Sequence, residues 1–205
     1  MDKLKISVII PTYNRTESLA NTIRSLKQQV FIGYEIIVVD NSCTDETKIL
    51  VEKEERDIDK NRCFIMYLPE PSIGLHNARH TGAKASKGEI LLYVDDDIIA
   101  DENLLNEILK PYADPVVGCV GGKILPKWEV NPPEWIKLFS LSWLSILDLG
   151  EEIKETEVLY GCNFSIRRQI LFDIGGFNPD GFPDRKYWYF RGDGEMGLLR
   201  KLHTS

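Results

Sequence analysis

The sequence has few of the features that mark several classes of protein. Its four cysteines lie far apart without C-x-x-C spacing, and it has only three histidines, which disfavours a disulfide framework and a zinc site. No apolar run approaches the ~18–20 residues that span a bilayer. Acidic residues outnumber basic ones, 32 to 25, and the net charge of −7 disfavours nucleic acid as a partner.

Reduced thiols and the lack of a secretory leader favour a cytoplasmic protein. Residues 1–5 lead directly into a strand pattern, so we expect no signal peptide. The longest apolar candidate for a membrane span, Leu138–Leu149, is too short and contains serines and Asp148. The chain ends soon after a helical pattern, which is consistent with a piece of a longer protein with a membrane-binding tail. Peripheral association with the inner face of a membrane therefore stays open.

What the chain does contain is an alternation of strand and helix patterns. Apolar, β-branched runs predict strands at Lys5–Pro11, Tyr34–Asp40, Cys63–Leu68 and Ile90–Val94. Helical spacing predicts helices at Thr16–Gln29, with Thr16 as N-cap, and at Thr44–Lys60, Gly74–Ala85 and Glu102–Tyr112. This order predicts an α/β fold with a mostly parallel sheet covered on both faces.

The second part of the chain has a different pattern. Strands are expected at Val116–Ile124 and Val158–Ile166, and helices at Arg168–Ile174 and Gly194–Leu202, around a proline-rich loop at Leu125–Pro133. We interpret residues 1–205 as one domain, with a ligand-binding half at 1–115 and a smaller mixed half at 116–205.

Polar clusters follow three of the predicted strands. They are Pro11–Arg15, Asp40–Ser42 and Asp95–Asp97. If the strands are parallel, these clusters project from one edge of the sheet, where ligands of open α/β sheets bind. The three endings together predict a pocket.

The three aspartates Asp95–Asp97 suggest a cation. Adjacent carboxylates repel one another, so a folded protein tolerates them best beside a positive charge. Their hard oxygens suit Mg²⁺ or Mn²⁺, which commonly bridge carboxylates to substrate phosphates. The alternative is a solvated turn in which Asp97 or Asp101 caps the next helix.

Other candidates have similar pairs of interpretations. Tyr13 could stack on a base and Asp40 could accept from a pyrimidine N–H, or they could form a surface contact and an Asx-turn. Arg79 lies in the predicted helix Gly74–Ala85, which is rich in small residues. Its side chain could bind a diphosphate or pair with the aspartates. Asp193 could act as a general base or cap a helix.

Several of these segments together resemble the family 2 glycosyltransferases, which have the Rossmann-like GT-A fold. The matching pieces occur in the family's order: ISVIIPTYNR (6–15), EIIVVDNSCTDET (35–47), GLHNARHTGAKASKGEILLYVDDD (74–97), YGCNFSIRR (160–168), GGF (175–177) and GDGEMGLLRKL (192–202). The resemblance implies inverting, metal-dependent transfer of a hexose from a nucleotide sugar, usually a UDP-sugar, to a hydroxyl of a glycan or lipid-linked acceptor. It also implies a role in polysaccharide biosynthesis of the cell envelope.

The resemblance also implies residue roles. The nucleotide sugar would be bound by Pro11, Thr12, Tyr13, Arg15, Asp40, Gly74, Asn77, Arg79, Asp95 and Asp96. Asp97, with Asp95, would hold Mn²⁺ or Mg²⁺. Asp193 would be the catalytic base and Glu195 a supporting carboxylate. Many relatives have Glu-Asp where this chain has Gly192-Asp193, so whether Asp193 or Glu195 is the base stays open. The rival classes are a metal-dependent nucleotidyltransferase, a two-carboxylate glycosidase and an inactive nucleotide-binding module.

Overall fold

The computed structural model describes residues 4–138, 144–178 and 194–204. Its strands are β1 (Ile6–Thr12), β2 (Tyr34–Asp40), β3 (Cys63–Pro69), β4 (Ile90–Tyr93), β5 (Cys119–Gly121) and β6 (Phe164–Arg167). Its α-helices are α1 (Thr16–Lys27), α2 (Asp45–Arg56), α3 (Leu75–Ala85), α4 (Leu104–Leu109), α5 (Arg168–Asp173) and α6 (Gly194–Thr204). Short 3-10 turns are η1 (Pro111–Ala113), η2 (Glu134–Leu138) and η4 (Gly161–Asn163).

The strands form one six-stranded sheet in the order β3-β2-β1-β4-β6-β5. The first four strands are mutually parallel, with Thr12 opposite Asp40 and Ile9 opposite Tyr93. β6 runs antiparallel to both β4 and β5. The predicted mostly parallel α/β fold is therefore confirmed, with the antiparallel strands confined to the second half of the chain.

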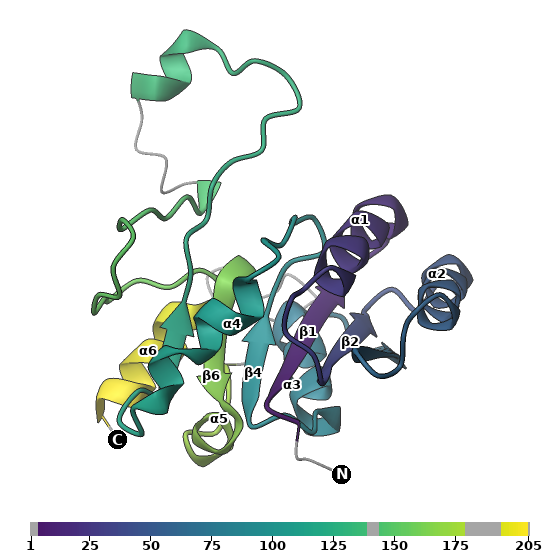
Figure 1. Cartoon of the computed structure of the whole chain (residues 1–205), viewed down its shortest axis with the longest axis horizontal. Coiled ribbons are helices and arrows are strands. Elements are labelled where there is room, and N and C mark those ends of the chain that lie inside the picture. The colour runs from purple at the N-terminus through teal and green to yellow at the C-terminus, as the bar shows by residue number, and fades with distance from the viewer. Residues whose placement is uncertain (1–3, 139–143, 179–193, 205) are drawn as a thin grey trace, which may run out of the picture.

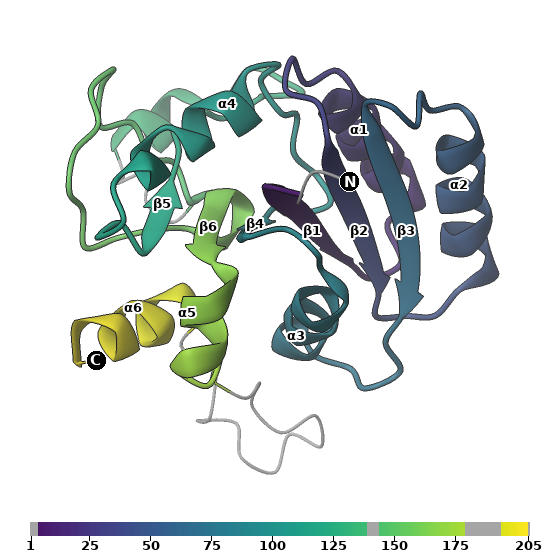
Figure 2. The ribbon, with the colours of Figure 1, turned by 60° about the horizontal axis from the view of Figure 1, so that its bottom comes forward.

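Two hydrophobic cores lie on opposite faces of the sheet. Side chains of α1, α2 and α4 pack on one face, and those of α3, α5 and α6 on the other (Figures 1 and 2). Alternate residues of each strand face opposite cores: Ile6, Val8 and Ile10 of β1 join the first, and Ile9 joins the second. This burial on both faces explains the continuous apolar runs in the sequence.

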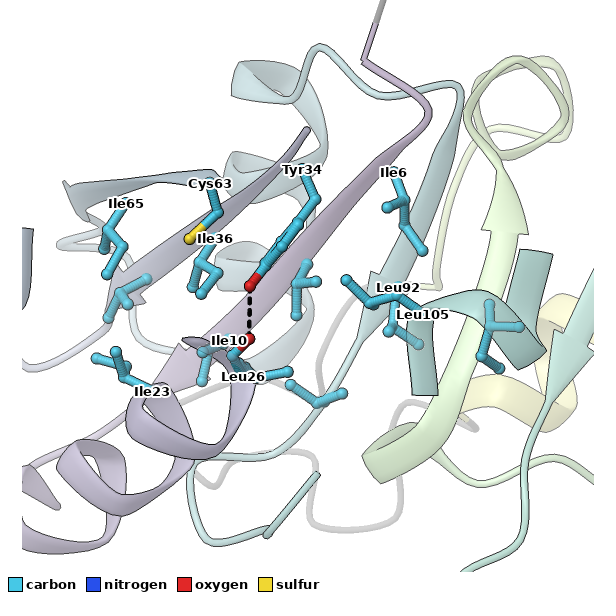
Figure 3. Packing of buried hydrophobic residues seen from close by; sticks show 14 of the residues in the cluster. Ile6, Ile10, Ile23, Leu26, Tyr34, Ile36, Cys63, Ile65, Leu92 and Leu105 are labelled. Atoms are coloured by element: carbon cyan, nitrogen blue, oxygen red, sulfur yellow. Dashed lines mark hydrogen bonds between the residues drawn. The ribbon is translucent and has the colours of Figure 1, made fainter. Parts of the chain in front are cut away.

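A buried hydroxyl in the first core finds its hydrogen-bond partner on the helix that packs there (Figure 3). The hydroxyl of Tyr34, a residue with no exposed surface, donates to the carbonyl oxygen of Leu26 at 2.6 Å. This hydrogen bond joins the start of β2 to the end of α1. Since a buried hydroxyl without a partner is costly, the contact helps to fix the helix on the sheet.

Element boundaries differ from the sequence expectation in several places. Thr16 is the first residue of α1 and Arg15 precedes it, so the N-cap role expected of Thr16 is wrong. The expected strand at 116–124 shortens to β5, and the expected strand at 158–166 becomes η4 followed by β6. In both cases pairing with a neighbouring strand, which local composition does not encode, sets the limits.

Between β5 and η4 the chain makes a long excursion away from the sheet (Figure 1). Its two limbs are joined by an antiparallel bridge between Ile124 and Leu147 and by the ion pair of Lys123 with Asp148. Among the helices that the structure describes, none is both long and apolar enough to cross a bilayer.

Candidate functional site

The three polar strand endings meet at one edge of the sheet, as predicted. The Asn41 N–H donates to the Thr12 carbonyl oxygen at 2.9 Å, and the Val94 N–H donates to that of Ile9 at 3.1 Å. A cavity of about 540 Å³ lies at this edge and is lined by Pro11, Thr12, Tyr13, Arg15, Asn41, Ile73, Gly74, Leu75, Ala78, Asp95, Asp96 and Asp97. Eight of these twelve are residues that the sequence singled out.

The middle aspartate is fixed in the pocket wall. Asp96 is 5% exposed, and its carboxylate accepts the Thr12 hydroxyl at 2.6 Å and Arg15 Nη1 at 3.3 Å. These contacts join the end of β1 to the residues that follow β4. A buried carboxylate requires such partners, because its unsatisfied oxygens would carry a large desolvation cost.

The two outer aspartates are less constrained by the protein. Asp97 is exposed and its carboxylate pairs with Arg15 Nη1 at 3.0 Å. Burial raises the pKa of the Asp95 carboxyl, the nearby Arg79 charge opposes the rise, and the negative charges of Asp97 and Asp96 add to it. Helix α4 begins at Leu104 with Asn103 before it, so Asp97 is not a helix cap.

The donor set suits a divalent cation that is shared with a ligand. Among the residues that the structure describes, no group of three or more His, Cys, Asp or Glu side chains forms a complete metal cage. Mg²⁺ and related ions, however, commonly take one or two protein carboxylates and complete their shell with phosphates and water. Asp95 and Asp97, with hard oxygens and crowded negative charge in the pocket lining, fit that partial role.

Asp40 is engaged within its own loop. Its carboxylate accepts five hydrogen bonds of 2.8–3.1 Å, from the backbone N–H and hydroxyl of Ser42, the N–H groups of Cys43 and Thr44, and the Tyr67 hydroxyl. Burial, the Asp40 charge and this hydrogen bond raise the pKa of Tyr67 to about 12. The geometry is that of the Asx-turn alternative. The contact of Asp40 with a base stays a prediction.

Asn41 is a pocket residue that the sequence placed in the polar cluster Asp40–Ser42 without assigning it a role of its own. Its side-chain amide donates to the carbonyl oxygens of Glu70 and Ser72, at 2.8 and 2.9 Å, and its oxygen accepts the Gly74 N–H at 2.7 Å. Gly74 has φ 146°, in the region that favours glycine, and directly precedes α3. Asn41 therefore holds the Gly74 turn against the end of β2. Its position between Asp40 and Ser42 was the one available signal.

Among the described residues, three other predicted ones do not line this cavity: Asn77, Arg79 and Glu195. Asn77 is half-buried and its amide donates to the Ser72 and Ile73 carbonyl oxygens at 3.3 and 3.2 Å. Arg79 is 2% exposed and pairs with Glu195 at 2.6 Å. Asp193 lies outside the described residues, so its catalytic assignment stays a prediction.

A second, larger cavity of about 2090 Å³ shares Asp97 with the first. It extends along α4 and β5 to the excursion, and it is bordered by Cys162 and Asn163 of η4 and by Leu199 of α6. Burial raises the pKa of the Cys162 thiol to about 11, and the Asp95 charge adds to the rise. Asp97 thus lines both the smaller pocket and the larger cleft.

Comparison with known proteins gives a family and several relatives. The family model described as glycosyl transferase family 2 matches residues 7–175. The chain is 27% identical over 183 residues to a glucosyl-dolichyl phosphate glucuronosyltransferase of Haloferax volcanii, covering 86% of this chain and 57% of that protein. It is 30% identical over 204 residues to the validoxylamine A glucosyltransferase of Streptomyces hygroscopicus subsp. jinggangensis, covering 85% and 47%.

Solved structures share the fold at lower identity. Mannosyltransferase PcManGT from Pyrobaculum calidifontis, in complex with GDP-Man and Mn²⁺, aligns with a TM-score of 0.63 and 23% identity, over 85% of this chain and 47% of that one. S. aureus TarS 1-349 in complex with UDP-GlcNAc aligns with a TM-score of 0.61 and 22% identity, over 85% and 48%. The chain spans about half the length of the relatives it matches. The family match, together with the confirmed GT-A fold, shows that the chain belongs to glycosyl transferase family 2.

Proposed function

We propose that this chain transfers a hexose from a nucleotide sugar, most simply a UDP-sugar, to an acceptor hydroxyl with inversion at the sugar's C1. The observation that carries the proposal is the 540 Å³ pocket at the carboxyl edge of the parallel strands, with Tyr13 at its mouth and Asp95–Asp97 in its wall. A nucleotide fits this combination, because it presents an aromatic base and a charged diphosphate to one cleft. The related TarS structure contains UDP-GlcNAc, which supports a donor of this class.

Each lining residue takes a role that its chemistry allows. Tyr13, 55% exposed, offers a ring on which a base can stack, and the Gly74 turn allows close approach of the backbone. Asp95 and Asp97 would hold Mg²⁺ or Mn²⁺, and the bound ion would offset the negative charge of the diphosphate leaving group. Arg15, which contacts Asp96 and Asp97, adds a positive charge beside the same group.

The chemical step needs a base on the acceptor side. We assign this role to Asp193, which would take the proton of an acceptor hydroxyl. The acceptor oxygen forms a bond to C1 while the bond from C1 to the diphosphate oxygen breaks, and the electron pair leaves with the nucleoside diphosphate. The 2090 Å³ cleft beyond Asp97 has room for a glycan or a lipid-linked acceptor. The Haloferax relative is named for a lipid-linked substrate, glucosyl-dolichyl phosphate, and this name supports a lipid-linked acceptor.

The cellular setting follows from the donor. Nucleotide sugars are charged and water-soluble, so we place the reaction in the cytoplasm, at the inner face of the membrane if the acceptor is lipid-linked. Transfer of this kind would serve polysaccharide biosynthesis of the cell envelope.

Calorimetric titration with UDP, with and without Mn²⁺, tests the donor site. We expect binding in the presence of Mn²⁺ that weakens by at least tenfold in Asp97→Asn, with the exposed Asp114→Asn as a matched control. No binding of UDP or GDP under either condition would refute the proposal and favour a glycosidase.

A hydrolysis screen over UDP- and GDP-sugars tests turnover. Asp193→Asn should abolish transfer and hydrolysis while UDP binding survives, because the base acts only on the acceptor. Full activity in that variant would refute the assignment of the base. Binding without turnover in the unaltered chain would indicate a nucleotide-binding module, and release of pyrophosphate would indicate a nucleotidyltransferase.

A further inference from the structure

An ion pair between a buried arginine and a half-buried glutamate lies next to the pocket without lining it. Arg79, on α3, directly follows the pocket residue Ala78 and is 2% exposed. Its Nη1 lies 2.6 Å from Glu195 Oε1, in the first turn of α6. The two helices come from the two halves of the chain, so this one contact joins the half that carries the pocket to the half that follows it.

Aromatic rings enclose the Arg79 guanidinium. Its Cζ lies 5.1 Å from the ring centroid of Phe177 and 5.8 Å from that of Tyr93. Both rings belong to buried residues. An arginine held in this way, with a carboxylate on one side and π-faces around it, is desolvated and has its charge balanced by the ion pair, while its Nε and Nη1 make no hydrogen bond among the described residues. It would have to break these contacts to reach a diphosphate in the neighbouring pocket.

Gly161, in η4, packs against the ion pair of Arg79 and Glu195. A methyl group built on Gly161 would overlap both Arg79 Nη2 and Glu195 Oε1. The turn therefore packs directly against the ion pair, and a side chain at Gly161 would displace the ends of these two side chains. This gives a way to disturb the pair without changing either charged residue.

Phe177 is itself held by the same helix, α3. The Phe177 N–H donates to His80 Nε2 at 3.0 Å, and the Phe177 ring stacks on His76 with centroids 5.2 Å apart. Lys201 of α6 donates to the Gly176 carbonyl oxygen at 2.7 Å. One face of α3 thus contacts Phe177, while Arg79 of the same helix contacts the start of α6.

From this arrangement we infer that Arg79 and Glu195 form a positioning pair: they dock the first turn of α6 onto α3 beside the pocket and contact neither nucleotide nor the transferred proton. The inference rests on the proposed transferase function, and it changes two roles that the sequence suggested. Arg79 holds α6 against α3 rather than binding the diphosphate. Glu195 supplies the charge that pairs with Arg79 rather than acting as a base. Correct placement of α6 then affects turnover, because misplacement of reacting groups by about 1 Å can cost roughly a hundredfold in rate.

A set of variants tests this inference: Arg79→Met, Glu195→Gln, the double variant Arg79→Met/Glu195→Gln, and Gly161→Ala. Lys84→Met, which removes an exposed charge from the same helix, is the matched control, and Arg79→Lys tests rescue by a shorter cation. The measurements are UDP affinity with Mn²⁺ by calorimetry, kcat for the nucleotide sugar that the unaltered chain hydrolyses fastest, and amide hydrogen exchange of residues 196–204.

We expect kcat to fall by roughly tenfold to a hundredfold in both single variants and in Gly161→Ala, with UDP affinity within about twofold of the unaltered chain. The double variant should be no slower than the slower single variant, because both changes break the same contact. A tenfold loss of UDP affinity in Arg79→Met but not in Gly161→Ala would overturn the inference in favour of a nucleotide contact. A further hundredfold loss on adding Glu195→Gln to Arg79→Met would overturn it in favour of a general base.

Hydrogen exchange separates this inference from the proposed function. Faster exchange of the α6 amides is expected in Arg79→Met and Gly161→Ala but not in Lys84→Met. If the unaltered chain bound no UDP or GDP, the proposed function would fail, and the exchange result would still decide whether the pair docks α6. Unchanged exchange in Arg79→Met and Gly161→Ala would overturn the docking role itself.

Discussion

Replacing Thr12 with valine removes one buried contact of the pocket wall with almost no change in shape. The Thr12 hydroxyl, on a residue that is 3% exposed, donates to the carboxylate of Asp96 at 2.6 Å. A hydrogen bond to a charged group contributes about 1.5–3 kcal/mol, and a buried carboxylate left short of a donor adds a desolvation cost. Asp96 keeps its longer contact with Arg15, at 3.3 Å. We therefore expect Thr12→Val to lower the free energy of unfolding by about 2–3 kcal/mol.

Urea unfolding followed by circular dichroism measures this change. With an m-value of about 2–3 kcal/mol per molar, the midpoint should fall by roughly 1 M at unchanged m. Thr12→Ser is the control, since it keeps the donor and should cost only about 1 kcal/mol for the lost methyl group. Adding Asp96→Asn should cost less in the Thr12→Val background than alone. A loss below about 0.5 kcal/mol, or equal losses in the valine and serine variants, would refute the reasoning.

Three further predictions concern other parts of the fold. Tyr34→Phe leaves the Leu26 carbonyl oxygen without its 2.6 Å donor and should lower the free energy of unfolding by about 1–2 kcal/mol; an unchanged urea midpoint would contradict this. Burial raises the pKa of the Cys119 thiol to about 12, so its reactive thiolate is scarce below that pH. A thiol reagent at pH 8–10 should therefore label the exposed Cys43 before Cys119, with Cys43→Ser as the control. Equal labelling rates for the two cysteines would contradict this prediction. Gly74→Ala places a side chain at φ 146°, so it should lower the free energy of unfolding by about 1–3 kcal/mol and weaken UDP binding. An unfolding free energy and a UDP affinity equal to those of the unaltered chain, measured by denaturation and calorimetry, would contradict this prediction.

The first half of the fold is largely predictable from the sequence. The strands at residues 6–12 and 34–40 are buried on both faces, so their composition alone identifies them as central parallel strands. Parallel strands bring their carboxyl ends to one edge, and this single rule placed Thr12, Tyr13 and the three aspartates around one cavity. No knowledge of side-chain contacts was needed for that step.

The second half and the finer roles depend on contacts between distant residues. Nothing near β6 in the sequence states that it pairs antiparallel with β4. In the sequence Asp40 has the residue type of a free ligand, and only the fold places four donors of residues 42–44 and the hydroxyl of Tyr67 around its carboxylate. Arg79 likewise has the residue type of a phosphate ligand, and only the packing of α6 and Phe177 against it reveals its partners.

The reversed direction of β6 also bears on how this family can diversify. Because Phe164 pairs with Tyr93, β6 begins at the edge of the sheet where β4 ends, so the long excursion that precedes it starts and finishes beside Asp97. Insertions or deletions within that excursion would leave every strand in register. Under the function proposed above, acceptor preference can therefore diverge among descendants of one ancestor while the proposed donor pocket is inherited unchanged.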